Sequence, residues 1–434
     1  MYRVGGLCRK RFVRLRLSCP EGSERLYGAV KLPRFRLPDQ PPTWLRHGPL
    51  RPGAFRSALH DERTASLVGT ALGVAFATAF VTGMISHELQ HPASWWPLPT
   101  RPVWFYRFTQ GLHVASGLAS IPLLLAKLWT VYPRLFAWPP VTSVLHALER
   151  LSILVLISGA IFELVTGLLN IVQWYPWQFY FTNAHYLVAW ITFGALLLHV
   201  AVKASVIARG LGNKGARAPE AEARQAEEEE AAPGGRRGAV SRRAMLTVTG
   251  VAVGVVTVTT VGESVTSLRS VDLLAPRYPT FGPQGVPINR TAVQARVETT
   301  ALDPAWRLNV TGPRPYELSL RELSALPQYT ANLPIACVEG WSVDASWQGV
   351  RMIDLLERVG APAGSEVRVI SLERSGSYAT MLMPHEYAED PLTLLALRLH
   401  GQPLSLDHGY PARIIAPARP GVLQTKWVSR IEVL

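Results

Sequence analysis

Long runs of uncharged, mostly apolar residues constrain the fold of this chain more than any other feature of its sequence. Residues 64–86 form a run of 23 residues without a charged side chain, and about 20 apolar residues are enough for a helix to cross a bilayer. Four further apolar stretches follow, at residues 108–130, 147–171, 185–207 and 244–262. The sequence therefore predicts an all-α transmembrane helical bundle of four spans, plus a fifth anchor span.

Positive charge lies beside these apolar runs. Of the net charge of +13, most comes from two segments: residues 1–63 hold 14 Lys and Arg against 5 Asp and Glu, and residues 203–243 hold 9 against 6. A basic protein can bind nucleic acid, but basic residues that flank spans are the pattern of cytoplasmic loops. We therefore expect a multi-pass protein of the cell membrane with a cytoplasmic N-terminus and no nucleic-acid partner.

Composition divides the chain into six units. The first segment is rich in Arg and Pro and lacks a cleavable signal-peptide pattern, which indicates a cytoplasmic tail. The segment after the fourth span carries the acidic run Glu227–Glu230 among Gly, Ala and Pro, which is typical of a solvated linker. The predicted units are a basic tail (1–63), a four-span membrane domain (64–208), a cytoplasmic linker (209–243), a fifth span (244–263), a second linker (264–284) and an extracytoplasmic domain (285–434).

Cys337 is the most informative residue of the last unit. It is the only cysteine after Cys19. A soft thiolate sulfur suits a transition metal, although a lone cysteine is also often a small buried core residue. It opens the motif Cys-Val-Glu-Gly-Trp-Ser, residues 337–342, and the elements 407–413 (Asp-His-Gly-Tyr-Pro-Ala-Arg) and 426–428 (Lys-Trp-Val) follow downstream. In this order the motifs resemble the molybdopterin-binding domain of the sulfite oxidase family, over about residues 285–434.

This resemblance implies a mixed α+β fold, a Mo-molybdopterin cofactor and Cys337 as the molybdenum ligand. It also implies a set of contacts to the pterin and its phosphate: Asn289, Arg290, Ser371, His408, Arg413, Gly421 and Lys426. A phosphate requires fixed cations, so Arg413 and Lys426 are chemically suitable. Tyr378 corresponds to the active-site tyrosine of sulfite oxidases and could donate a proton in the reaction; the alternative is an ordinary half-buried tyrosine.

Local patterns in this domain agree with an α+β fold. Short β-rich segments at Trp306–Val310, Val367–Ser371 and Arg413–Ile415 alternate with Pro/Gly turns, which is the pattern of strands. Residues Arg351–Val359 are the clearest helix, with apolar faces and the exit residue Gly360.

The first four spans contain a weak internal repeat. Val81-Thr82-Gly83 in the first span corresponds to Val165-Thr166-Gly167 in the third, and Leu112-His113 corresponds to Ala184-His185. A duplicated helical hairpin is a natural way to build a four-helix bundle with pseudo-symmetric sites in its core.

Histidines recur in this bundle at a distinctive spacing. His185 and His199 are 14 residues apart, which is about 21 Å along a helix and places them on nearly the same face. Alternating spans put His113 at the outer level with His185, and His146 at the inner level with His199.

This spacing resembles the last haem-binding helix of cytochrome b561-like and formate dehydrogenase gamma-like subunits. The resemblance implies one or two b-type haems, held by His113 with His185 and by His146 with His199. Lys127 stands at the repeat equivalent of His199, which weakens the inner pair. Histidines that only bond between helices are the alternative.

The motif Ser241-Arg242-Arg243-Ala244-Met245-Leu246 directly precedes the fifth span. It resembles a twin-arginine export signal, although paired arginines before a span also satisfy positive-inside topology. A molybdopterin domain normally folds around its cofactor in the cytoplasm, so export of a folded domain by the twin-arginine translocase would suit it.

These features together predict a membrane-bound, molybdenum-dependent oxidoreductase. We expect it to reduce a small or protein-bound S- or N-oxide with electrons from the quinone pool, passed through membrane haem. Animal and plant sulfite oxidases have an arginine where this chain has Ser342, and that difference favours the reductase. The alternatives are a sulfite-oxidising type that passes electrons to quinone and a non-catalytic, membrane-anchored cofactor-binding module.

The twin arginines generate a prediction about export. Replacing Arg242 and Arg243 with lysine keeps the charge and therefore the positive-inside signal, but removes the guanidinium groups. We expect the first four spans of this variant to insert while residues 264–434 stay in the cytoplasm. Protease added to spheroplasts should then digest this domain in the parent and spare it in the variant. Equal digestion of both would reduce the motif to a topology signal.

Overall fold

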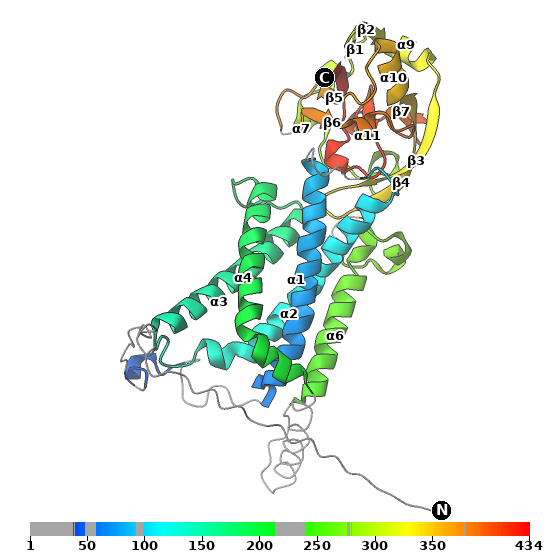
Figure 1. Ribbon diagram of the computed structural model, residues 1–434. Helices are drawn as coiled ribbons and strands as arrows, with labels where there is room; N and C mark the ends of the chain where they lie inside the picture. The colour runs from blue at the N-terminus through cyan, green and yellow to red at the C-terminus, as the bar shows by residue number, and fades with distance from the viewer. Residues whose placement is uncertain are drawn as a thin grey trace, which may run out of the picture.

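The computed structural model describes residues 38, 40–47, 58–92, 99–212, 240–275, 278, 280–376 and 378–434. In this structure a long helical bundle carries an α+β domain at one of its ends (Figure 1). Most of the predicted basic tail, and nearly all of the predicted linker after the fourth span, lie outside the described residues.

Five helices in the described part of the chain are long and apolar enough to cross a membrane. They are α1 (Glu62–Gln90), α2 (Phe105–Leu135), α3 (Val144–Ile171), α4 (Phe181–Leu211) and α6 (Arg242–Val258). Each of them contains or overlaps one of the five apolar stretches read from the sequence, so the prediction of five apolar helices is confirmed. Many outward-facing side chains on these helices, such as Leu125, Leu154 and Leu187, are large, apolar and exposed, which suits a lipid-facing surface.

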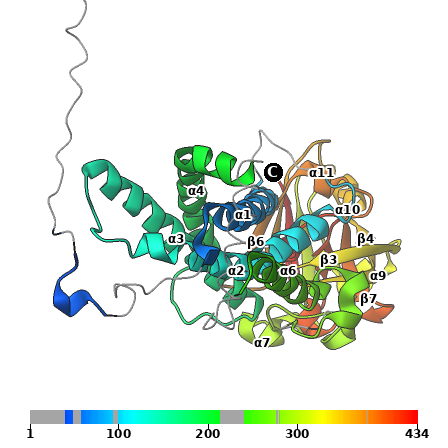
Figure 2. The same ribbon diagram turned by 90° about the horizontal axis from the view of Figure 1, so that it is seen from below.

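The helices pack as two hairpins with an added fifth helix. Helix α1 packs against α2 and α4, α3 packs against α4, and α6 packs against α2, an arrangement visible along the bundle in Figure 2. Glycines allow the closest approaches: Gly159 of α3 faces Thr192 of α4, and Gly210 faces Ser66 of α1, with no room for a Cβ at either position. Small residues at such crossings are typical of helices that pack in membranes.

The first arginine of the twin-arginine motif has a partner within the fold. Asp61 caps α1 by accepting a hydrogen bond from the Thr64 backbone N–H at 2.8 Å. Its other carboxylate oxygen accepts a hydrogen bond from Arg242 Nη2 at 3.0 Å, and Arg242 Nε donates to Thr64 Oγ1 at 2.9 Å. Arg242 therefore ties the start of α6 to the start of α1, at the end of the bundle away from the α+β domain (Figure 1).

The C-terminal domain contains two five-stranded sheets. One has the order β2-β1-β10-β5-β6, with β1 and β10 parallel and the other neighbours antiparallel. The other has the order β3-β4-β7-β8, with β9 paired to β7. The strands are β1 (Arg307–Thr311), β2 (Tyr316–Ser319), β3 (Tyr329–Ala336), β4 (Ser342–Arg351), β5 (Val367–Ser371), β6 (Thr380–Met383), β7 (Leu394–Leu399), β8 (Gln402–Pro403), β9 (Arg413–Ile415) and β10 (Val428–Val433).

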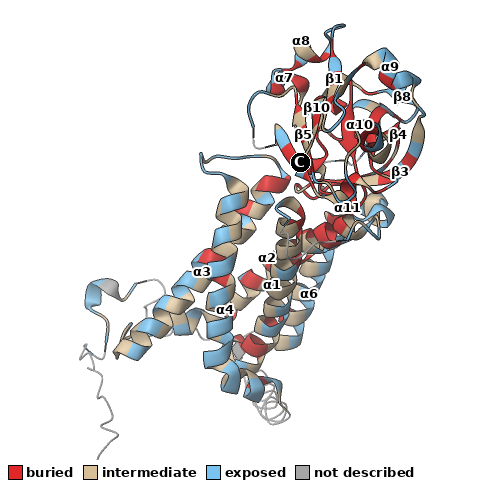
Figure 3. Ribbon diagram, turned by 45° about the horizontal axis from the view of Figure 1, so that its top comes forward, coloured by how far each residue is buried: buried red, intermediate tan, exposed pale blue. Residues whose placement is uncertain are grey.

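Short helices join these strands: α7 (Ala292–Ala295), α8 (Glu298–Ala301), α9 (Leu320–Ala325), α10 (Met352–Val359) and α11 (His385–Ala388). Buried side chains concentrate in this domain rather than in the bundle (Figure 3). Its largest core cluster includes Leu308, Met352 and Ile431, all at most 1% exposed. The domain therefore has its own hydrophobic core, whereas the bundle keeps an apolar exterior.

The predicted strands and helix of this domain are confirmed. Two of the three predicted strands coincide with β5 and β9, and the third differs from β1 by one residue at each end. The predicted helix is α10, which ends at Gly360 with a φ of +74°. A left-handed residue at this position is a common helix stop, and glycine adopts it without steric strain.

The Asp61–Arg242 contact provides a control for the export experiment. In the variant Asp61→Asn the new side chain would still cap α1, because asparagine and aspartate are comparable caps, but it would lose the charge that Arg242 pairs with. We expect this variant to lower the free energy of unfolding by about 1 kcal/mol, since the pair is only partly buried, and to leave export unchanged. Thermal denaturation in detergent and protease accessibility in spheroplasts measure the two effects separately. Loss of export in Asp61→Asn would mean that the lysine variant fails through packing and not through recognition of the motif.

Candidate active site

One cavity of the C-terminal domain is lined by the residues that the sequence predicts to bind molybdopterin or to act in catalysis. All nine line its wall, which encloses about 70 Å³. They are Asn289, Arg290, Cys337, Ser371, Tyr378, His408, Arg413, Gly421 and Lys426. Because these residues come from distant parts of the domain's sequence, only the fold of the two sheets brings them together.

Cys337 lies in a tight turn between β3 and β4. Its backbone N–H donates to the Trp341 carbonyl at 2.9 Å, and the Gly340 N–H donates back to the Cys337 carbonyl at 3.1 Å. Gly340 has a φ of +102°, and a Cβ there would lie 3.2 Å from Val114 of α2. The backbone conformation therefore favours glycine, and a larger residue would also have to displace Val114 slightly. Cys337 itself is only 1% exposed, as expected for a metal-binding cysteine held in the wall of a cavity.

Two cations, Arg413 and Lys426, line the same cavity, and we call them the cation wall. Arg413 donates to the His408 carbonyl at 3.1 Å and stacks over the Trp347 ring, with its guanidinium carbon 5.0 Å from the ring centroid. Lys426 donates to the Asp407 carbonyl at 3.1 Å and also to the carbonyl of Arg290. These contacts fix both side chains in place, and no carboxylate among the described residues is bonded to either positive charge.

The electrostatics of this wall favour an anionic ligand. Burial lowers the pKa of Arg413 to about 9. Burial, with a contribution from Arg413, lowers the pKa of Lys426 to about 7 and that of His408 to about 4. Glu373 is the one carboxylate among the described residues that line the cavity, and it is paired with Arg290. A bound anion such as a phosphate would stabilise the charged form of Lys426 and Arg413.

Unsatisfied polar atoms also point to a polar ligand. In the described structure Arg413 Nε, Gln424 Oε1 and Thr425 Oγ1 are buried without a hydrogen-bond partner, and all three residues line the cavity. Buried polar groups are normally paired, so donors and acceptors in this number fit a pterin with its phosphate. The sequence analysis did not identify Gln424 and Thr425, although they directly precede Lys426 in the chain.

Tyr378 lies on the same cavity, half-buried. Burial raises the pKa of its phenol to about 12, with smaller contributions from Tyr180 and Cys337. The hydroxyl therefore keeps its proton at neutral pH and is a hydrogen-bond donor. Tyr180 belongs to the loop between α3 and α4, so the helical bundle reaches the neighbourhood of this site.

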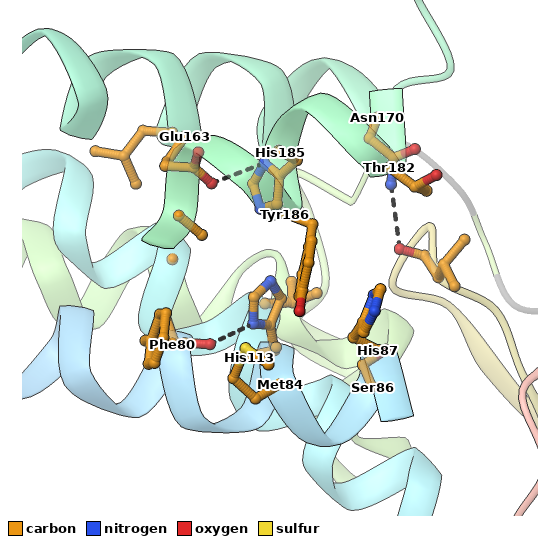
Figure 4. A pocket seen from close by; sticks show the side chains of 18 of the residues that line it. Phe80, Met84, Ser86, His87, His113, Glu163, Asn170, Thr182, His185 and Tyr186 are labelled. Atoms are coloured by element: carbon orange, nitrogen blue, oxygen red, sulfur yellow. Dashed lines mark hydrogen bonds and ion pairs between the residues drawn. The ribbon is translucent and has the colours of Figure 1, made fainter. Parts of the chain in front are cut away.

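A second cavity, of about 200 Å³, lies among α1, α2, α3 and α4 and extends up to Val338 of the cysteine turn. His113 and His185 face each other inside it (Figure 4), with ring centroids 6.3 Å apart and planes inclined at 72°. The structure thus brings together the outer pair of histidines that the sequence predicted.

Each of these histidines is oriented through Nδ1. His113 Nδ1 lies 2.9 Å from the Ala79 carbonyl. His185 Nδ1 lies 3.0 Å from a Glu163 carboxylate oxygen and 3.1 Å from Thr166 Oγ1. Hydrogen bonds at Nδ1 to a carbonyl or carboxylate are the usual second partners of metal-binding histidines, and they leave Nε2 as the ligand atom.

The glycine of each Thr-Gly pair in the internal repeat lies beside one of the two histidine rings and leaves space for it. In the first hairpin, a Cβ on Gly83 would lie 3.1 Å from Cε1 of His113, and in the second a Cβ on Gly167 would lie 3.7 Å from Cε1 of His185. The two Thr-Gly pairs therefore hold equivalent positions beside equivalent histidines, as the repeat predicts.

The inner pair has different surroundings. His146 Nδ1 lies 3.0 Å from Thr142 Oγ1, and its Nε2 accepts a hydrogen bond from Arg150 Nε at 3.3 Å. His199 has Lys127, Lys203 and Glu149 as charged neighbours, and Lys127 donates to the Ala65 carbonyl at 2.7 Å. Both ring nitrogens of His146 are thus engaged, and haem ligation by His146 and His199 stays a prediction.

Comparisons with known proteins agree with the first cavity. Residues 294–434 match the family model described as the oxidoreductase molybdopterin binding domain. The C-terminal part of the chain is therefore a molybdopterin-binding domain of an oxidoreductase. The predicted boundary at residue 285 is close to the start of this match.

The curated relatives are of the same type. The chain is 33% identical over 130 residues to YuiH, an uncharacterized oxidoreductase of Bacillus subtilis, covering 29% of this chain and 64% of that protein. It is 30% identical over 154 residues to the catalytic subunit MsrP of a protein-methionine-sulfoxide reductase from Burkholderia mallei, covering 32% and 46%. It is 30% identical over 162 residues to human mitochondrial sulfite oxidase, covering 30% of each. The chain thus spans less than two thirds of each of these relatives.

Lys426 provides a test of the cation wall. Lys426→Met keeps the length of the side chain and removes the charge that a phosphate would contact. Because a hydrogen bond to a charged group is worth about 1.5–3 kcal/mol, we expect cofactor affinity to fall about 10-fold or more. Molybdenum and pterin content per protein, measured under limiting cofactor supply, report this change. Arg430→Met on β10, where the side chain is half exposed, is the matched control and should load as the parent does.

The lowered pKa of Lys426 generates a second prediction. Between about pH 7 and pH 10.5, the unfolded chain holds a proton on this lysine that the folded, cofactor-free protein has lost. Stability then rises with pH in this window, because the unfolded state binds more protons. We expect the melting temperature of cofactor-free parent, relative to that of Lys426→Met, to increase from pH 7 to pH 9. A constant difference between the two proteins over this range would contradict the assignment.

Proposed function

We propose that this chain is a membrane-bound, molybdopterin-dependent oxidoreductase that reduces an S- or N-oxide. In this proposal the quinone pool supplies the electrons, and haem in the bundle passes them to the molybdopterin site. The observation that carries it is the position of Cys337: it lines the cavity with the cation wall, and its neighbour Val338 lines the cavity that contains His113 and His185.

The residues of the first cavity suit a molybdopterin. Cys337 would hold the metal as thiolate, while Arg413 and Lys426 would hold the phosphate. The bound cofactor supplies two-electron oxygen-atom transfer. Tyr378, protonated at neutral pH, would donate a hydrogen bond to the oxygen of the substrate.

The absence of a cation at position 342 favours reduction of a neutral oxide over oxidation of sulfite. Ser342 is buried, and its carbonyl accepts a hydrogen bond from Arg269 at 2.9 Å. For a sulfoxide, the reaction balances when one quinol gives two electrons and two protons. The S–O bond then breaks, and the oxygen leaves as water.

The geometry of the second cavity supports one haem at the outer level. Two imidazoles that share one first-row metal at roughly 2 Å each have ring centroids roughly 6 Å apart, and His113 and His185 are separated by 6.3 Å. No group of three or more His, Cys, Asp or Glu side chains that could hold a metal ion occurs among the described residues. A haem needs only two axial ligands, so this pair would suffice.

Orientation follows from the same proposal. Arg134, Arg209 and Arg242 lie beside Asp61 and Glu62 at the start of α1. This start of α1 is the end of the bundle opposite the C-terminal domain (Figure 1), and basic residues favour the cytoplasmic side. The molybdopterin domain would then lie outside the cytoplasmic membrane, delivered there by the twin-arginine translocase.

A visible spectrum and metal analysis of detergent-purified protein test this proposal directly. We expect molybdenum, and a b-type haem spectrum that His185→Leu removes while molybdenum is retained. Cys337→Ser should retain the haem spectrum and abolish turnover, whereas a non-catalytic module would keep its role in this variant. Protein without molybdenum would overturn the catalytic proposal. Faster turnover with sulfite than with methionine sulfoxide would favour the sulfite-oxidising alternative.

A further inference from the structure

The turn that carries Cys337 is seated on the membrane bundle. Gln110 Nε2 of α2 donates to the Val338 carbonyl at 3.2 Å. Asn170 Nδ2 of α3 donates to the same oxygen at 3.1 Å (Figure 4). One main-chain oxygen, in the residue that directly follows the cysteine, thus accepts hydrogen bonds from two side-chain amides that belong to different helical hairpins. We call Gln110, Asn170 and the Val338 carbonyl the amide clamp.

The rest of the turn is held from the same side. Gln173, just after α3, donates to Glu339, whose other carboxylate oxygen accepts from Trp341 Nε1 at 2.9 Å. The Ser264 hydroxyl, which follows α6 in the chain, donates to the Gly340 carbonyl. Glu339 and Gly340 of the turn are therefore hydrogen-bonded to residues that follow α3 and α6. Trp341 is held indirectly, through its hydrogen bond to Glu339.

The amide clamp also borders the histidine cavity. Gln110, Asn170 and Val338 all line that cavity together with His113 and His185. On α2, Tyr106, Gln110 and His113 are spaced as i, i+4 and i+7, which places them along one helix face. Tyr106, 1% exposed, packs against Ala336 immediately before the cysteine. One face of α2 thus runs from the cysteine to the cavity, over about 10 Å of helix.

We infer that the amide clamp is the electron-transfer junction between the bundle and the molybdenum site. Electrons from a haem between His113 and His185 would reach Cys337 through the Val338 peptide, which Gln110 and Asn170 hold against the cavity. This inference rests on the proposed function, in which one quinol would give two electrons and two protons and one oxide would be reduced to the deoxygenated product and water. A haem held by His113 and His185 would supply the one-electron relay between them. The two amides are positioning residues, since they act through the peptide that they hold.

The test separates electron delivery from the chemistry at the molybdenum. Gln110→Leu/Asn170→Leu removes both donors at nearly constant volume. We expect quinol-driven reduction of methionine sulfoxide, and reoxidation of the reduced haem in a single turnover, to slow about tenfold or more, because two hydrogen bonds are lost. Turnover with a reduced viologen dye, which can donate to the molybdenum site directly, should stay at the parent rate.

A control and a cofactor-independent readout complete the experiment. Arg101→Met removes the ion pair with Asp390, a contact between the two domains that involves neither the cysteine turn nor the histidine cavity, and should leave haem reoxidation unchanged. In protein from a host that makes no molybdopterin, residues 337–341 should resist protease in the parent and in Arg101→Met but be cleaved in the double variant. Protease cleavage thus reports whether the turn is held against the bundle, independently of enzymatic activity.

The outcomes distinguish this inference from the proposed function. If the parent lacks haem or molybdenum, the proposed function fails. If both are present and the double variant reoxidises its haem at the parent rate, the junction lies elsewhere and the inference alone fails. Equal loss of quinol-driven and dye-driven turnover would assign the amides a purely structural role and also overturn it.

Discussion

The contact between a five-residue turn and the end of a helical bundle organises this molecule. The turn contains the cysteine that lines the molybdopterin cavity, and helices α2 and α3 donate hydrogen bonds to its backbone. Because a buried carbonyl without partners is costly, the turn is most stable when the bundle lies beneath it. Gly340, where a Cβ would lie only 3.2 Å from Val114, allows this close approach. Without the C-terminal domain, the side-chain amides of Gln110 and Asn170 would lose their common acceptor. Without the bundle, the Val338 carbonyl would lose both donors.

Much of the architecture could be predicted from the sequence, because it depends on composition and short motifs. Apolar stretches of about 20 residues have few alternatives to membrane helices, and all five appear as helices in the described part of the chain. The nine residues of the first cavity were predicted from the resemblance to the sulfite oxidase family. For Cys337, Arg413 and Lys426 the residue type itself also gives a chemical reason. The structure adds that they share one cavity, although their roles towards the cofactor stay predictions.

Other features could not be predicted, because they depend on how distant segments meet. The contact of Asn170 with Val338 joins residues 168 positions apart, and neither residue is unusual in its own segment. Arg242 was read as part of an export signal, and its ion pair with Asp61 became visible only when α6 was seen beside α1. The histidine spacing in α4 predicts two levels, and in the sequence only Lys127 weakens the inner one. Only the contacts of each ring distinguish the outer pair, with Nε2 available, from the inner one, where Arg150 donates to Nε2 of His146.

The amide clamp has a consequence for how this interface can change over evolution. Gln110 and Asn170 bind a main-chain oxygen, which every amino acid at position 338 would offer equally. The side chain of residue 338 can therefore be exchanged without breaking the hydrogen bonds, and no compensating substitution is needed in the helices. Covariation between position 338 and the bundle should consequently be weak, even though the contact is close. Substitutions at position 338 would then leave these hydrogen bonds intact. Loss of the amide at position 110 or 170 could not be compensated by any change of the side chain at position 338.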